Sequence, residues 1–585
     1  MSKLKIFLAD LTHNYKETSN RYMPYGVGLI AAYAKKIYGD DIEVKLFKYP
    51  DKLHKALTEE HCDILGCATY VWNTGLSHWA CKVAKKINPD TLTVLGGPNF
   101  AKDKNQKIEY LNSHKFVDIR VLLEGEVAFT NIIKLVLKFG IKNRKEIFRN
   151  KIEGCCYLHQ NKKELVEAYL PRMEFLDEIP SPYTTGILDE FFDGKLGPIL
   201  QTSRGCPFSC NFCHESEKYY SRIYAFQSQY AIDELEYIGK KMADTKTVAN
   251  LVIADSNYGM YKRDKLVSQK IVEIQKKYNW PQGIIMSTGK HFGNVIENTE
   301  MLMDIFDFTM SVQSMDAGVL EEVKRKNIPP SKYKAAGEYL RKKGRDSLVE
   351  IIVPLPKESL KTYFQGMKDL MAWKVSRIVS NTIMFLNGTE FKNKEYIDKF
   401  GYKSKFRLIP RQFGIYGGDK VYEIEEVGIA TNSMSFEDYL ETRKFGFITE
   451  MLFNSRILRE VELFVDDCKN IGLKVLSPDI NRSSYRFEDI DSKTILYGLG
   501  AIKGIGESLV DKIVSERKDG MYKDMYDFCM RVGFNKINKR ILTALIGAGA
   551  LDCLGDRESL FKRIDSCLRN AEHASERNKS NIKDL

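Results

Sequence analysis

Three cysteines in one short loop are the residues of this sequence with the clearest chemistry. Cys206, Cys210 and Cys213 stand at a C-x3-C-x2-C spacing, after a short apolar run that indicates the end of a buried strand. Three thiolates can hold three irons of a cubane [4Fe–4S] cluster and leave the fourth iron open, whereas four-thiolate clusters are the usual electron carriers. Metal sites with an open coordination position are usually catalytic. The spacing therefore predicts a catalytic iron–sulfur cluster.

Zinc, or three unrelated thiols, is the alternative interpretation of this loop. Zinc would need a fourth ligand, and His214 follows Cys213 directly. However, zinc sites usually pair two C-x2-C units, or one such unit with distant histidines. No second unit of this kind is present in the sequence, which favours iron and sulfur.

The triplet also carries an aromatic residue, Phe212, directly before its third cysteine. In this respect it resembles the radical S-adenosylmethionine (SAM) enzymes. In that family the free iron chelates the amino and carboxylate groups of SAM, and one electron from the cluster splits SAM into methionine and a 5′-deoxyadenosyl radical. The resemblance implies that Phe212 lies beside the cofactor and that an electron donor such as flavodoxin or ferredoxin is a partner.

The composition sets broad limits on the protein. A length of 585 residues predicts three or four domains, and 43% hydrophobic with 29% charged residues is typical of a soluble globular protein. No apolar run approaches the ~20 residues of a membrane span, and no signal peptide is visible. Twelve cysteines are too few for a disulfide scaffold, which favours a reducing cytoplasm. A net charge of +11 permits nucleotides or nucleic acid as partners without requiring them.

Residues 1–150 alternate apolar strands with amphipathic helices. This pattern predicts an α/β, Rossmann-like domain whose parallel sheet is covered on both faces and binds ligands at the carboxyl ends of its strands. The residues at those strand ends, taken in chain order, make this region resemble the cobalamin-binding domain of one large class of radical SAM enzymes. The resemblance implies that cobalamin contacts this set, which comprises Tyr70, Trp72, Gly96, Gly97 and Glu124.

One cobalamin pattern is missing from this region. A D-x-H-x-x-G motif would supply a histidine below the cobalt, but His13 and His54 each follow an aspartate by three residues and lack the glycine. The lower cobalt ligand therefore stays open, with Tyr70 and Trp72 as candidates to pack against the lower face. Two alternatives are that these aromatic residues belong to the core, and that the domain binds no cofactor.

A linker over residues 151–194, with prolines that disfavour helix, leads to the expected catalytic part at 195–400. Strand candidates there are the apolar run before Cys206 and residues 250–255, 283–288, 308–314, 348–353 and 379–384. The family resemblance implies a partial (β/α)6 barrel, in which cofactor and substrate meet at the carboxyl ends of the strands. Polar residues at those ends are candidates to hold SAM, with ordinary loop caps as the alternative: Asp255, Ser287, Gln313 and Ser314. Residues 401–455 are expected to cover the substrate.

The character of the chain changes after about residue 456. The run from Cys468 to Asn481 and further runs as far as Asp552 resemble a helix-hairpin-helix region in the alpha chain of bacterial DNA polymerase III. We expect a small all-α domain at 456–569 and a disordered polar tail at 570–585. The catalytic aspartates of that polymerase are absent, so this region is not expected to polymerise DNA.

Gly504, Ile505 and Gly506 predict a tight turn between two helices. Backbone N–H groups there can face a DNA phosphate at the start of the helix from Glu507. Lys503 and Lys512 could add positive charge, which would give weak DNA contact without sequence preference. The alternative is a helix hairpin that serves packing alone.

The sequence as a whole predicts a cobalamin-type radical SAM enzyme that performs methyl transfer or rearrangement on a substrate the sequence does not name. One alternative is a nucleic-acid-binding or polymerase-derived protein in a chimeric chain. Another is a methylthiotransferase, which needs a second cysteine trio, and Cys62, Cys67 and Cys81 fall on the wrong elements for this role. Whether the two joined resemblances reflect a natural fusion also stays open.

Overall fold

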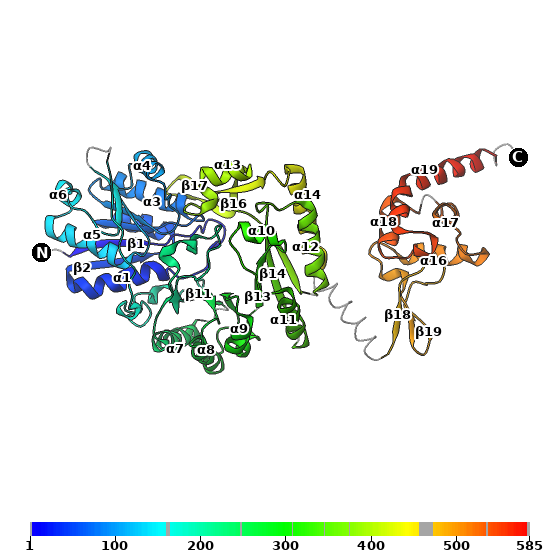
Figure 1. Cartoon of the computed structure of the whole chain (residues 1–585), viewed down its shortest axis with the longest axis horizontal. Helices are drawn as coiled ribbons and strands as arrows, with labels where there is room; N and C mark the ends of the chain where they lie inside the picture. The colour runs from blue at the N-terminus through cyan, green and yellow to red at the C-terminus, as the bar shows by residue number, and fades with distance from the viewer. Residues whose placement is uncertain are drawn as a thin grey trace. The chain divides into compact units, whose positions relative to one another are not determined.

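The computed structural model describes residues 3–159, 164–245, 249–306, 308–343, 345–373, 375–454, 472–533 and 536–581. It divides into two compact units, Met1–Asn454 and Ser455–Leu585, which are described separately (Figure 1). The resemblance beginning at Cys468 falls partly outside the described residues. Among the residues that are described, no helix combines the length and apolar character that a membrane crossing needs.

The first domain is built on a seven-stranded sheet in the order β2-β1-β3-β4-β5-β6-β7. Strands β1 to β5 are parallel, and β6 and β7 continue the sheet antiparallel. Alternate residues of β1 enter different cores, with Ile6 and Leu8 in one and Phe7 in the other. The predicted parallel sheet with two covered faces is confirmed. The strands are β1 Leu4–Ala9, β2 Ile42–Phe47, β3 Ile64–Ala68, β4 Leu92–Gly96, β5 Ile119–Val121, β6 Cys155–Leu158 and β7 Leu165–Glu167.

Six helices accompany this sheet: α1 Tyr25–Tyr38, α2 Pro50–Glu59, α3 Thr74–Ile87, α4 Lys104–Ser113, α5 Glu126–Phe139 and α6 Arg144–Arg149. Helices α1 and α5 pack on the core that contains Ile6. Helix α3 packs on the core that contains Phe7. Because β1, β3, β4 and β5 are parallel, their carboxyl ends lie at the same edge of the sheet.

The catalytic part contains two three-stranded parallel sheets, in the orders β12-β11-β8 and β13-β14-β15. Thr288 of β12 donates a hydrogen bond of 2.9 Å to the carbonyl oxygen of Thr309 in β13, so the sheets meet there. All six expected strands are present, which agrees with the partial barrel. They are β8 Ile199–Leu200, β11 Leu251–Tyr258, β12 Ile284–Thr288, β13 Phe308–Gln313, β14 Ser347–Val353 and β15 Arg377–Thr382. Their helices are α7 Ser228–Asp244, α8 Asp264–Tyr278, α9 Phe292–Thr299, α10 Ala317–Glu322, α11 Pro330–Lys342 and α12 Leu360–Ala372.

A long antiparallel hairpin follows the short helix α13, Lys394–Phe400, and consists of β16, Lys403–Tyr416, and β17, Asp419–Ala430. It precedes helix α14, Phe436–Ile448. Strand β17 contacts the first domain, because the Glu423 carboxylate accepts the backbone N–H groups of Gly75 at 2.7 Å and Leu76 at 3.0 Å, at the start of α3. The hairpin therefore spans the two halves of the first unit.

In the described residues of the second unit, four helices pack around an apolar core of their own, and a small sheet precedes them in the chain. Its elements are β18 Lys474–Leu476, β19 Glu488–Asp491, β20 Thr494–Leu496, α16 Glu507–Glu516, α17 Met525–Val532, α18 Lys539–Gly547 and α19 Arg557–Asn581. The expected helical domain is confirmed, and the structure adds a three-stranded sheet, in the order β18-β20-β19, that the all-α expectation did not include. Residues 570–581, the start of the tail expected to be disordered, lie in α19. That helix buries Leu560, Ile564, Cys567 and Ala571 along one face, and this stripe anchors its first half.

Candidate active site

The segment before the cysteine loop is fixed by a buried carboxylate. Asp255, on β11, is 3% exposed and accepts hydrogen bonds from the Thr202 backbone N–H at 2.7 Å and the Ser203 hydroxyl at 2.8 Å. Burial raises the pKa of Asp255, and these donors counteract it. Its contacts position the strand that leads into the loop, and its direct contact with cofactor stays a prediction.

The loop begins at a glycine that no other residue could replace without strain. Gly205 has φ +105°, and a Cβ there would lie 2.6 Å from the carbonyl oxygens of Tyr220 and Arg222. The next N–H, of Cys206, donates to the Tyr220 oxygen at 2.9 Å. The loop therefore folds against the returning segment, which carries the short pairing of β9, Ser203–Arg204, with β10, Tyr224–Ala225.

The three thiols are partly or fully buried and lie close enough for their charges to affect one another. Burial raises the pKa of Cys206, and it raises that of Cys213 to about 11, with smaller contributions from the charges of Cys206 and Cys210. Across the described ranges, no three His, Cys, Asp or Glu side chains are placed to hold one metal ion. A cubane differs from such an ion because each thiolate binds a different iron. Thiols that bind iron must lose their protons, so cluster binding is coupled to pH.

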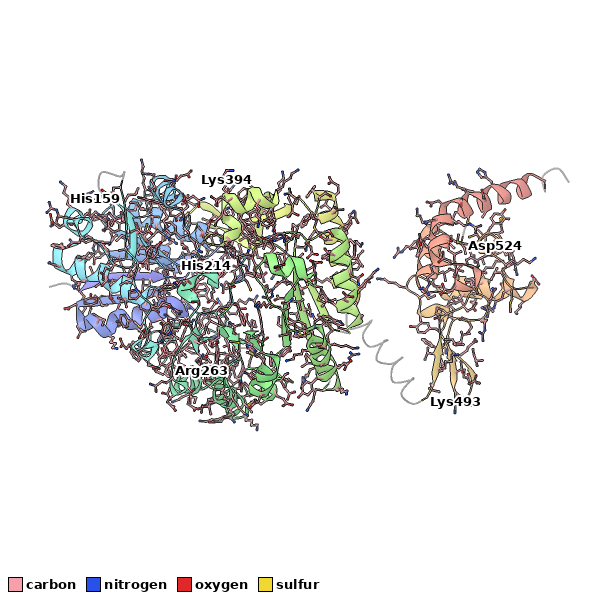
Figure 2. The ribbon with its side chains drawn as sticks, in the orientation of Figure 1. His159, His214, Arg263, Lys394, Lys493 and Asp524 are labelled. Carbon is pink, nitrogen blue, oxygen red and sulfur yellow. The ribbon has the colours of Figure 1, made fainter. Side chains whose placement is uncertain are left out.

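A cavity of about 790 Å³ lies between the first domain and the cysteine loop. One wall is the edge of the sheet, with Tyr70, Gly96, Gly97 and Glu124 among its residues, and the other includes Gly205, His214, Glu215 and Ser256. Figure 2 labels His214 in the middle of the first unit. The structure thus brings four of the five residues expected at cobalamin into the wall of one cavity, which residues directly before and after the three cysteines also line.

The fifth residue, Trp72, is not in that wall but supports it. Its ring stacks on Tyr70 with centroids 4.6 Å apart and planes 4° apart. Gly97 has φ +95°, and a Cβ there would lie 2.7 Å from the carbonyl oxygen of Thr69. The wall at Gly97 is therefore bare backbone, which allows a ligand to approach closely.

Two buried ion pairs join the first domain to the segments around the cysteine loop. Arg204 Nη2 lies 2.7 Å from Glu126 Oε1, and Arg172 Nε lies 3.0 Å from Glu124 Oε1. Burial alone would raise the pKa of Glu126, but the Arg204 guanidinium outweighs it and leaves this pKa below its ordinary value. The second oxygen of Glu124 is buried without a hydrogen-bond partner in the described structure. Such an oxygen is suited to accept a ligand's N–H group.

The residues expected to hold SAM are not gathered in the cavity wall. Gln313 is 8% exposed, has φ +68°, and its Oε1 has no partner among the described residues. Ser314 donates to Glu358 Oε2 at 2.6 Å. Ser287 is exposed near the end of β12, and Phe212 packs edge-on against Phe391 with centroids 6.4 Å apart. Of these four side chains, Gln313 has a buried acceptor that lacks a hydrogen-bond partner among the described residues. The contacts of all four with SAM stay predictions.

The predicted DNA-binding turn lies at the start of α16. Lys503, Gly504 and Gly506 are exposed there, but Ile505 is 4% exposed and belongs to the core, and Lys512 pairs with Glu516 at 2.5 Å. The turn follows a single turn of 3-10 helix over Leu499–Ala501, where the sequence predicts a full helix. The exposed backbone before α16 remains available to an anion.

The middle of the chain matches the model of a known protein family. Residues 200–370 match the family model of the radical SAM superfamily. The chain carries a radical SAM domain. Residues 472–560 match the family model of the helix-hairpin-helix motif, so the second unit carries that motif.

Relatives resemble the two parts of the chain separately. The cobalamin-dependent radical SAM methyltransferase TokK of Streptomyces tokunonensis is 23% identical over 474 residues, which cover 77% of this chain and 66% of TokK. The DNA polymerase III subunit alpha of Vibrio cholerae serotype O1 is 50% identical over 109 residues, which cover 18% of this chain and 9% of that protein. The chain thus spans just under two thirds of the length of TokK.

A solved structure has the same overall fold. The cobalamin-dependent SAM radical enzyme OxsB, with aqua-cobalamin and SAM bound, aligns with a TM-score of 0.52 and 12% identity. The alignment covers 100% of this chain and 80% of OxsB. At this identity the likeness concerns the fold.

The radical SAM domain also depends on residues that the sequence did not single out for the site. Glu126 lies two residues after Glu124 and Arg204 lies two residues before Cys206, so closeness in sequence to these candidates was the available signal. Arg172 lies in the linker, and no spacing or motif marks it.

Proposed function

We propose that this chain is a cobalamin-dependent radical SAM methyltransferase. The observation that carries the proposal is the cavity of about 790 Å³, because the sheet edge expected at cobalamin forms one wall and residues on either side of the three cysteines, Gly205 and His214 among them, line the other. The similarity to TokK supports methyl transfer over rearrangement. When bound, cobalamin supplies a methyl group and the cluster with SAM supplies a radical on the substrate.

The residues present fit these cofactors. The cavity volume of about 790 Å³ is within the ~300–1,000 Å³ of typical ligand sites. Gly97 leaves the backbone accessible, and Glu124 Oε2 is an unsatisfied acceptor at the wall. Cys206, Cys210 and Cys213 would hold the cluster, and Gln313 Oε1 is an acceptor for a SAM donor group.

The chain's own groups have positioning roles in this proposal. The pairs Arg204–Glu126 and Arg172–Glu124 hold the cysteine loop and the sheet edge on opposite sides of one space. The electron for SAM cleavage would come from a donor such as flavodoxin or ferredoxin. A reducing cytoplasm suits an oxygen-sensitive cluster and twelve cysteines.

The test is anaerobic reconstitution of the full chain. We expect about four irons per chain, SAM cleavage on reduction, and a corrinoid absorption band that survives gel filtration. Cys206→Ala, Cys210→Ala and Cys213→Ala should each abolish SAM cleavage, whereas Cys553→Ala, an exposed cysteine of the second unit, should not. Gly97→Val should lose the corrinoid band, with Gly293→Ala as the control because a Cβ there meets nothing within 4 Å. Full SAM cleavage by any of the three cysteine variants would contradict the cluster assignment.

A second function is favoured by the helix-hairpin-helix match. We propose that the second unit binds DNA weakly and without sequence preference through the exposed backbone of Gly504 and Gly506 at the start of α16. Backbone N–H groups and a helix N-terminus attract phosphate, and Lys503 is exposed beside them. The similarity to the polymerase subunit over 109 residues supports this role.

A further inference from the structure

Two positively charged side chains converge on one cysteine of the loop. Lys290 Nζ lies 3.9 Å from Cys210 Sγ, and Arg325 Nη1 lies 3.7 Å from the same sulfur. Lys290 follows the end of β12, and Arg325 follows α10, so the two cations arrive from different parts of the domain. Cys210 is buried, and Arg325 is only 9% exposed. The contact therefore lies away from bulk water, where charge is weakly screened.

Other contacts hold these cations in place. Arg325 Nε donates to Asn327 Oδ1 at 2.9 Å, and its Nη2 donates to the carbonyl oxygen of Ser311. Lys290 Nζ lies 4.0 Å from the centre of the Phe208 ring. Within the described part of the chain, no ion pair to a carboxylate is formed by either side chain. Their charge is therefore directed at Cys210 rather than neutralised nearby.

The other two thiols lack such partners among the described contacts. Cys206 Sγ accepts a neutral N–H from Asn257 Nδ2 at 3.3 Å. Reduction of a [4Fe–4S] cluster adds one electron, and net charge and hydrogen bonds at the sulfurs are main determinants of its potential. Positive charge beside one thiolate lowers the free energy of the reduced form more than that of the oxidised form.

From this asymmetry we propose that Lys290 and Arg325 raise the reduction potential of the cluster through the Cys210 thiolate. The proposal rests on the proposed function, because it requires a cluster at the three cysteines. The two residues are positioning residues: they act on the reduction potential through the Cys210 thiolate. Their effect exists before SAM binds, since both cations already contact the sulfur in the protein alone.

Potentiometric titration of the reconstituted full chain, followed by electron paramagnetic resonance without SAM, tests the proposal. Lys290→Met and Arg325→Met keep much of the side-chain volume and remove the charge, and each should shift the midpoint to more negative potential. The double variant should shift it further. Arg325→Lys keeps the charge and should shift it less than Arg325→Met. Lys334→Met, an exposed lysine of α11, is the matched control and should leave the potential unchanged.

The outcomes separate this inference from the proposed function. Wild-type protein without iron would refute the proposed cluster, whereas an iron-loaded wild type with unshifted Lys290→Met and Arg325→Met would refute only the redox role. Unshifted potentials together with weaker SAM binding would overturn the inference and assign the cations to the SAM carboxylate. A variant that binds less iron is still informative, because the midpoint does not depend on the fraction of chains loaded.

Discussion

Glu234 is a buried carboxyl group with no cationic partner among the described residues, and its replacement by glutamine should change how stability depends on pH. It lies on α7, is fully buried, and accepts hydrogen bonds from Ser181 Oγ at 2.7 Å and Tyr25 OH at 3.2 Å. Burial raises its pKa from 4.5 to about 8, and the two hydroxyl donors only partly offset this effect. The native state therefore keeps a proton that the unfolded state releases.

The sign and size of the effect follow from these pKa values. Because the pKa of Glu234 is higher in the folded state, its contribution favours folding below about pH 4.5 and is lost as pH rises toward about 8. The interval between 4.5 and about 8, at 1.36 kcal/mol per pKa unit, corresponds to a loss of roughly 5 kcal/mol in the free energy of unfolding. Glu234→Gln keeps a carbonyl acceptor and has no charge to bury, so it should remove this loss.

Urea unfolding of the cluster-free full chain between pH 5.5 and 8.5 measures this effect. All four tryptophans lie in Met1–Asn454, so their fluorescence reports on that unit. Glu234→Gln should gain stability over wild type as pH rises, by several kcal/mol at pH 8.5. Glu236→Gln is the control on the same helix, because lysines 270 and 277 lower the pKa of Glu236 to about 2, below the tested range. Parallel pH profiles for wild type and Glu234→Gln would refute the reasoning.

Two further predictions concern the domain contacts and the second unit. Glu126→Gln leaves Arg204 buried with a weaker partner. It should lower the free energy of unfolding by about 3–5 kcal/mol at pH 7. A loss below about 1 kcal/mol, measured by urea unfolding, would contradict the role of this ion pair. Gly504→Val should weaken duplex binding in fluorescence anisotropy at low salt, because φ is +89° there, whereas Gly506→Ala, at φ −86°, should bind nearly as wild type. Salt-independent binding would leave the turn a packing element.

The sequence was informative wherever the determining contacts are local. The order of strands and helices follows from hydrophobic periodicity, and the loop with Cys206, Cys210 and Cys213 follows from spacing within eight positions. The six strands of the radical SAM domain were found because each is a short apolar run between helical patterns. The residues at which these strands end were less predictable. Strand β11 continues to Tyr258, three residues beyond the predicted end, because Asn257 and Tyr258 are also buried.

The glycine pair of the second unit shows where a local motif is not sufficient. Gly504 and Gly506 look equivalent in the sequence, and both were expected to serve the close approach of phosphate. In the structure only Gly504 has a positive φ, and Gly506 has an ordinary extended backbone as the residue that precedes α16. Which glycine is conformationally required depends on how the chain enters the helix, and that depends on Ile505 packing into the core.

The relation between the two cofactor sites depends on contacts that no local pattern could indicate. Glu126 and Arg204 are 78 positions apart in the sequence, and Glu124 and Arg172 are 48 apart. In each pair, however, a guanidinium nitrogen lies no more than 3.0 Å from a carboxylate oxygen. Glu126 is the first residue of α5, where helix N–H groups favour a carboxylate, so its own helix stabilises its charge in addition to Arg204. The cysteine loop is therefore placed against an anionic anchor of the first domain. It follows that a charge change at the sheet edge should be felt at the cluster without any change in the cysteine motif itself.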